Sequence, residues 1–148
     1  MKRVFKSILM MLLIFTLFTA TTAVVYAEET STTSYNEVVA IVDKANEDIQ
    51  AKIDEAVTKA DDLTASYNMG LALIKDTPKY NKIAKELKAV YDKQLDEVAE
   101  TLVKETNEIA DKAIREAEEK GYTIQCQLVP VQLGDRVVMI DPLVIIGF

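Results

Sequence analysis

The chain has 148 residues, which suits one domain of ordinary size and is too short for two independent globular domains. It carries 17 basic and 24 acidic residues, for a formal net charge of −7, which argues against nucleic acid, anionic lipid surfaces and anionic wall polymers as direct ligands. It has no histidine and one cysteine, which removes the commonest general base, the usual zinc ligands and most nucleophile triads.

Residues 1–27 have the pattern of a secretory signal peptide. A short basic segment precedes an apolar stretch, and Val25 and Ala27 occupy the two positions that a signal peptidase reads. We expect cleavage after Ala27, which leaves a secreted, extracellular chain with 14 basic and 24 acidic residues. The alternative is an uncleaved leader that anchors the protein in a membrane with the rest of the chain outside, because the apolar stretch approaches the ~20 residues that span a bilayer.

Residues 28–33 are polar and directly follow the leader, which predicts a disordered lead-in. A capping box from Ser34 to Glu37 then predicts the start of a helix, which we expect over about residues 35–75. Apolar or small residues recur along it at steps of three and four, as on one face of a helix. These residues are Val38, Val42, Ala45, Ile49, Ile53, Ala56, Ala60, Leu63, Tyr67, Leu71 and Ile74.

The segment Asp76-Thr77-Pro78 predicts a reversal of the chain. Pro78 suits the first turn of a new helix, with Asp76 or Thr77 as the cap. We expect this second helix over about residues 78–120, ending at Lys120 and a glycine cap at Gly121. Its stripe comprises Tyr80, Ile83, Leu87, Tyr91, Leu95, Val98, Leu102, Thr106, Ile109, Ala113 and Ala117.

Both stripes drift with an eleven-residue period, as in Val38, Ile49 and Ala60. This period corresponds to about 3.67 residues per turn, so the helices should be nearly straight or wind slightly to the right. Residues 34–121 are therefore predicted to form a long, coiled-coil-like, antiparallel two-helix hairpin.

The composition changes after Gly121, and residues 122–148 alternate as in β-strands. Ile124, Cys126 and Leu128 alternate with polar residues, which predicts a strand with one buried face. Gly134-Asp135 supplies a turn into a return strand over residues 136–140, and residues 143–146 are a candidate third strand.

Pro130 places the first of these strands at an edge or gives it a bulge. The predicted fold class is therefore α+β and predominantly α. It consists of the helical hairpin and a small antiparallel β-hairpin or three-stranded sheet, packed together as one domain.

The sequence predicts no catalytic, cofactor or metal site. Paired carboxylates such as Asp61 and Asp62 fall on helix positions that face solvent, and neither a calcium loop nor a glycine-rich phosphate loop is present in the sequence. Cys126 is interpreted as a small buried side chain on a strand, the alternative being an intermolecular disulfide.

The C-terminal segment is interpreted as too apolar to stand exposed. Either it packs on the helices and closes their core, or one edge or face docks on another chain. The candidate interaction surface comprises Asp135, Arg136, Asp141 and Phe148.

We therefore expect a secreted, non-enzymatic protein-interaction or structural protein. Its partner would be an unknown protein or a second copy, with no nucleic acid, and with membrane contact only through an uncleaved leader. The alternative is a small extracellular ligand-binding protein or carboxylate-dependent enzyme with a pocket between helices and sheet.

Overall fold

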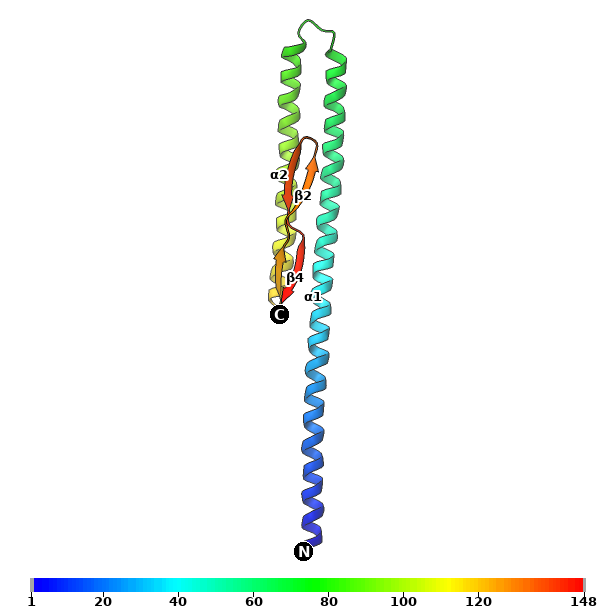
Figure 1. Cartoon of the computed structure of the whole chain (residues 1–148), viewed down its shortest axis with the longest axis vertical. Helices are drawn as coiled ribbons and strands as arrows, with labels where there is room; N and C mark the ends of the chain where they lie inside the picture. The colour runs from blue at the N-terminus through cyan, green and yellow to red at the C-terminus, as the bar shows by residue number, and fades with distance from the viewer. Residues whose placement is uncertain (1, 148) are drawn as a thin grey trace. The chain divides into compact units, whose positions relative to one another are not determined.

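The computed structural model describes the backbone of residues 2–147 and the side chains of residues 34–147. Its elements are α1 (Lys2–Ile74), α2 (Tyr80–Glu118), β1 (Thr123–Cys126), β2 (Val129–Leu133), β3 (Arg136–Ile140) and β4 (Leu143–Gly147). The chain divides into two compact units, residues 1–39 and 40–148, and the packing described below is that of the second unit (Figure 1). The predicted leader, its cleavage after Ala27 and the lead-in lie outside the residues with described side chains.

The ends of the helices agree with the predicted ones to within a few residues, except at the start of α1. The capping-box residues Ser34 to Glu37 lie inside α1, so they do not mark its first turn. At its other end α1 passes through Gly70 and ends at Ile74.

The turn between the helices differs from the predicted one in the role of Thr77. Its hydroxyl donates to the carbonyl oxygen of Ile74 at 2.8 Å, so it closes the last turn of α1. It does not cap α2, which begins at Tyr80 after Lys79. Pro78 therefore lies in the loop and not in the first turn of the second helix.

The C-terminus of α2 is the glycine cap that the sequence predicts. Gly121 has a φ of +83°, in the region that favours glycine. The amide of Tyr122 donates to the carbonyl oxygen of Ala117 at 3.0 Å, as in a Schellman motif. This turn leads the chain back onto the helix pair as β1.

The eleven-residue period of the two stripes is confirmed by burial. In the second unit the buried residues of α1 are Val42, Ala45, Ile49, Ile53, Ala56 and Ala60, and Val38 of the first unit is buried as well. Those of α2 are Tyr91, Leu95, Ala99, Leu102, Thr106, Ala110, Ala113 and Ala117. Each set repeats after eleven residues. Val98 and Ile109 were predicted in the second stripe but are only half-buried, and their neighbours Ala99 and Ala110 are buried instead.

The two helices pack antiparallel. The hydroxyls of Thr64 and Tyr91 share a hydrogen bond of 3.2 Å, and Lys52 forms an ion pair with Glu105 at 3.0 Å. These contacts occur in opposite order along α1 and α2, which confirms the predicted helical hairpin (Figure 1).

The strands form two antiparallel pairs, β1 with β4 and β2 with β3, and not a three-stranded sheet. Because β1 leads into β2 and β3 into β4, the pairs are successive parts of one long hairpin with an interruption between them. The amide of Gln127 donates to the carbonyl oxygen of Pro142 at 2.8 Å within that interruption. Both strands of a two-stranded pair are edges, which is why Pro130 is accommodated opposite Met139.

One face of the β-strands packs on the helices. The buried side chains of this inner face are Ile124, Val131, Leu133, Ile140 and Leu143. The side-chain amide of Asn46 on α1 donates to the carbonyl oxygen of Leu143 at 3.0 Å and accepts from its amide at 2.8 Å. Asn46 thereby satisfies the backbone of β4 as a neighbouring strand would. The described architecture is thus a mostly helical α+β fold.

Candidate interaction surfaces

Two of the predicted interaction residues, Asp135 and Arg136, hold the β2–β3 turn on α2. The guanidinium of Arg136 donates to the carboxylate of Asp96 at 2.8 Å and to the carbonyl oxygen of Asp92 at 3.1 Å. Asp135 forms an ion pair with Lys88 at 3.4 Å. All of these contacts lie within one chain, and a role of Asp135 and Arg136 in binding a partner stays a prediction.

The turn itself reaches between the helices through Gly134. Its φ of +56° at the first turn position is typical of a type II′ hairpin. A Cβ added at Gly134 would lie 2.6 Å from the Tyr91 hydroxyl and 3.1 Å from both Thr64 and Leu95. Glycine is therefore required here both by conformation and by the closeness of the two helices.

Cys126 is exposed, so its interpretation as a buried side chain is wrong. β1 ends at Cys126 and the hairpin is interrupted there, so the predicted alternation does not carry the thiol to a covered position. Partial burial still raises the pKa of the Cys126 thiol, and the carboxylates of Asp141 and Asp111 raise it further. An intermolecular disulfide stays a prediction.

Of the remaining predicted residues, Asp141 lies in the interruption between β3 and β4 and is half-buried. Phe148 lies outside the described residues. The four predicted interaction residues therefore do not form a single described patch.

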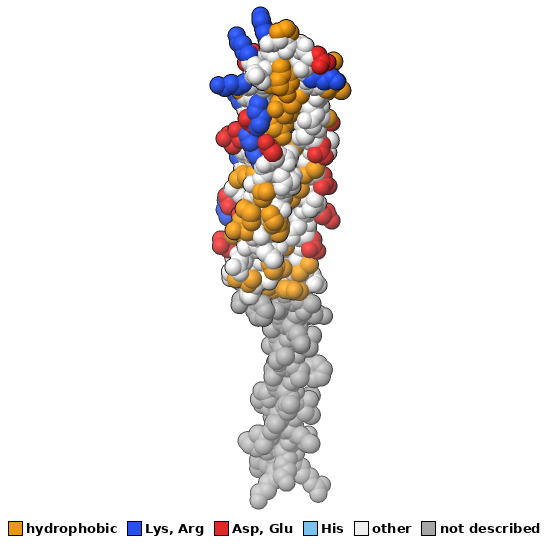
Figure 2. Space-filling model, turned by 45° about the horizontal axis from the view of Figure 1, so that its top comes forward, with side chains coloured by type: hydrophobic (Ala, Val, Ile, Leu, Met, Phe, Trp, Pro, Cys, Tyr) orange, Lys and Arg blue, Asp and Glu red, His pale blue; other side chains and the backbone are white. Residues whose placement is uncertain are grey.

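The outer face of the β-strands holds five of the ten exposed large hydrophobic residues in the part of the chain with described side chains. We define the outer sheet face as the exposed residues Leu128 (61%), Val137 (60%), Met139 (46%), Val144 (42%) and Ile146 (57%). The strand register places uncharged residues beside them, with Gln132 opposite Val137 and Gln125 opposite Val144. Figure 2 shows hydrophobic side chains gathered over the part of the molecule that holds the strands.

The interpretation that this segment is too apolar to stand exposed is therefore wrong for one of its two faces. The two strand pairs follow one another along the hairpin and have two faces, and the helices cover only the inner one. The signal was present in the sequence, because β3 and β4 are apolar at successive positions and do not alternate with polar residues.

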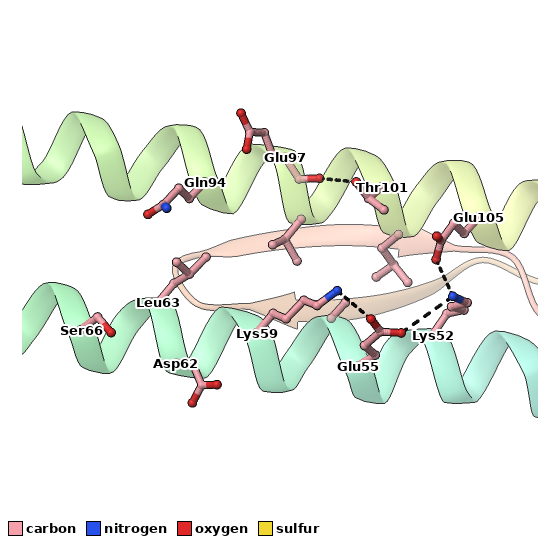
Figure 3. Close-up of a pocket in the computed structure, with 13 residues that line it drawn as sticks. Lys52, Glu55, Lys59, Asp62, Leu63, Ser66, Gln94, Glu97, Thr101 and Glu105 are labelled. Carbon is pink, nitrogen blue, oxygen red and sulfur yellow. Dashed lines mark hydrogen bonds and ion pairs between the residues drawn. The ribbon is translucent and has the colours of Figure 1, made fainter.

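A second surface is a groove between the helices on the side away from the strands. On α2, Asp96 faces Arg136 of β3, whereas Gln94, Val98 and Thr101 line the groove on the other side of the buried stripe. Figure 3 shows the β2–β3 hairpin behind the helices and the lining side chains in front. The groove has a volume of about 490 Å³, and its apolar floor comprises Ala56, Leu63, Val98 and Leu102.

The groove continues along the helix pair. A second hollow of about 390 Å³ includes Ala45, Ile109 and Ala113. Ala45 lies eleven residues before Ala56 and Ile109 eleven residues after Val98, so the eleven-residue period returns them to the same face. The half-buried stripe residues Val98 and Ile109 thus belong to the groove.

Four charged residues on the rim of the groove, Lys52, Glu55, Lys59 and Glu105, are paired with one another. Lys52 lies 3.0 Å from Glu105 and 3.8 Å from Glu55, and it joins the two helices across the groove (Figure 3). The hydrogen bond from Lys59 lowers the pKa of Glu55, and Lys52 lowers it further. Glu55 is therefore held in its ionised form and is unsuited to act as a general acid near neutral pH.

Residues 34–147 contain no group of three or more histidine, cysteine or acidic side chains arranged to hold a metal ion. Within this same part of the chain, no helix has the length and apolar character needed to cross a membrane. Comparison with protein-family models, curated proteins and solved structures finds no significant match.

Proposed function

We propose that the protein is an exported, non-enzymatic interaction protein that self-associates by packing the outer sheet faces of two copies against each other. The observation that carries this proposal is the exposed, uncharged outer sheet face. Contiguous apolar surface on a protein otherwise rich in charge is typical of a protein–protein interface. Two sheets pack face to face in the same way inside β-sandwiches, about 10 Å apart.

Charge favours a second copy as the partner. Residues 34–147 hold 14 basic and 22 acidic residues, so two copies repel each other over most of their surface. The outer sheet face has no charged side chain of its own, and it is where two copies meet with the least repulsion. A face that contacts its own copy in this way forms a closed, two-fold dimer.

The groove gives weaker support to the alternative, a ligand-binding protein or an enzyme, than the outer sheet face gives to self-association. Its volume falls within the range of small-molecule pockets. However, Glu55 and Glu105 are paired with lysines, and the pKa of Glu55 is lowered where a catalytic acid requires a raised one. The groove also lies between the helices, on the side away from the strands, and not between helices and sheet.

The test is the molar mass in solution, measured by light scattering after size exclusion, with reductant present throughout. We expect a dimer that becomes a monomer in the double variant Val137→Lys/Ile146→Lys, because two lysines per copy would be buried at the interface. The control is Leu73→Lys with Met69→Lys, which adds the same charge at residues that are more exposed than Val137 and Ile146 and lie outside the outer sheet face. A monomeric parent protein, or a dimer lost equally in both variants, would contradict the proposal.

Reductant distinguishes a dimer held together by the outer sheet face from one held together by a Cys126 disulfide. A dimer that forms only without reductant, and that disappears in Cys126→Ser, would be a disulfide dimer. That result would confirm the alternative prediction for Cys126 and reject the outer sheet face as the main contact.

A further inference from the structure

The end of the helical hairpin has the opposite charge to the rest of the described chain. We define the hairpin end as residues 69–90, which comprise the last part of α1, the loop and the first part of α2. It holds five lysines and two acidic residues, for a net charge of +3. The other described residues, 34–68 and 91–147, hold nine basic and twenty acidic residues, for a net charge of −11.

The lysines of the hairpin end are largely free to bind. Among the described residues, Lys75, Lys79 and Lys85 have no carboxylate within ion-pair distance. Lys82 lies 4.0 Å from Glu86, and its side chain is 78% exposed. Only Lys88 is engaged by the body of the protein, since it pairs with Asp92 and Asp135.

Large apolar side chains are exposed among these lysines. Leu73 is 78% exposed, Met69 67% and Tyr80 36%. Met69 and Leu73 each lie two residues from the stripe residue Leu71 and therefore project from the opposite side of α1, where Thr58 and Asp62, eleven residues earlier, are exposed as well. Figure 2 shows lysines at this end of the molecule with hydrophobic side chains running between them.

We propose that the hairpin end docks on the surface of an anionic lipid bilayer. In this arrangement Leu73 and Met69 enter the boundary between headgroups and acyl chains, and Tyr80 lies at headgroup level, where amphipathic aromatic side chains are favoured. Lys75, Lys79 and Lys85 reach the lipid phosphates with their ammonium groups.

The apolar residues distinguish a bilayer from a soluble polyanion. A soluble polyanion would contact the lysines and leave Leu73 and Met69 in water, whereas a bilayer accommodates both kinds of side chain. The overall negative charge had argued against a lipid surface. The positive charges are nevertheless gathered at one end, and electrostatic forces at a membrane fall off within about 10 Å, so the acidic body does not prevent binding through that end.

The experiment measures co-sedimentation of the full chain with vesicles of phosphatidylglycerol and of phosphatidylcholine, and its readout is the ratio of the two affinities. Residues 1–33 are identical in all variants, so differences between variants report on the hairpin end.

The first variant replaces three lysines of the hairpin end, Lys75→Gln/Lys79→Gln/Lys85→Gln. The second variant makes an equal change of charge at lysines that are 75–79% exposed on the body, Lys93→Gln/Lys104→Gln/Lys112→Gln. We expect the parent protein to prefer the anionic vesicles and the first variant to lose about fivefold in affinity per lysine, or roughly a hundredfold in total. The second variant should stay within about threefold of the parent.

A third variant tests how much the exposed apolar side chains contribute to vesicle binding. Leu73→Ser/Met69→Ser should weaken binding to anionic vesicles at least tenfold and leave binding to soluble heparin unchanged. No preference of the parent for anionic vesicles would overturn the proposal, as would equal losses in the two lysine variants. Unchanged vesicle binding in the serine variant would instead indicate a site for a soluble polyanion.

Discussion

The helical hairpin has a covered and an uncovered part, although both are built from the same kind of stripe. Where the strands lie on the helices, Leu95 is 0% and Ile49 2% exposed. Beyond the β2–β3 turn, Leu71 and Leu87 occupy stripe positions and are only half-buried. An apolar stripe on a helix is about 100° wide, and one neighbouring helix covers only part of it. A two-helix hairpin therefore needs a third element to complete its core, and here the strands supply it over part of its length.

The covered and the uncovered parts of the helical hairpin also differ in net charge. Acidic residues predominate in residues 34–68 and 91–147, and the unpaired Lys75, Lys79 and Lys85 lie in the hairpin end, beyond the β2–β3 turn. Stability and binding are thus expected to reside in different parts of one hairpin. The following substitutions test this separation, beginning with the largest expected effect.

Leucine truncation should be costly in the covered part and nearly neutral in the uncovered part. Leu95→Ala removes a fully buried side chain next to Gly134 and should lower the free energy of unfolding by about 3 kcal/mol. Leu73→Ala removes a side chain that is 78% exposed and should change it by less than about 0.5 kcal/mol. Urea denaturation followed by circular dichroism measures both values. Similar losses in the two variants would mean that the hairpin end is packed in solution.

Substitution of Gly134 should detach the strands from the covered part. In Gly134→Ala the new methyl group would meet Tyr91, which cannot move easily because its ring stacks on Tyr67 at 4.8 Å. The positive φ adds a conformational penalty, and we expect a total loss of about 2 kcal/mol. Gly147→Ala is the matched control, since no atom lies within 4 Å of its added methyl group. Equal effects at the two glycines in a denaturation experiment would contradict the close approach at Gly134.

Substitution of Gly70 should have the smallest effect and the opposite sign. Gly70 is inside α1 at the uncovered end, where alanine stabilises a helix by up to about 1 kcal/mol relative to glycine. The added methyl group would lie 3.3 Å from the end of the Leu87 side chain, which is only half-buried and free to adjust. We expect Gly70→Ala to raise the midpoint of thermal unfolding by a few degrees. A lowered midpoint would show that Leu87 is tightly held.

Most elements of the fold could be predicted because they depend on local rules. The eleven-residue period, the glycine cap at Gly121 and the Gly134-Asp135 turn each follow from the preferences of a few neighbouring residues. Predictions that needed distant contacts were less successful. Cys126 was assigned to a buried face because its strand was assumed to alternate without interruption. Asp76 or Thr77 was predicted to cap the second helix, but that helix begins after Lys79, and the Thr77 hydroxyl bonds to the end of the first helix, because a hydroxyl in a short loop is close to both helices.

The candidate interaction surfaces were harder to predict from the sequence than the fold was. The outer sheet face depends on which side of the strands meets the helices, and β3 and β4 are apolar on both sides. The positive charge of the hairpin end is hidden in a chain of overall negative charge, because its five lysines, from Lys75 to Lys88, are spaced three or four residues apart and form no continuous basic run.

The sequence by itself determined that there are two long helices with matching stripes, a reversal near Pro78 and an uncharged strand-forming segment after Gly121, because these features follow from periodicity, turn residues and composition. Only the tertiary structure decided how far the strands cover the helices, since that limit is set where Gly134 meets Tyr91 and Thr64. This limit leaves the stripe residues Leu71 and Leu87 of the hairpin end only half-buried, because burial depends on which surfaces the folded chain brings together and not on the side chains alone.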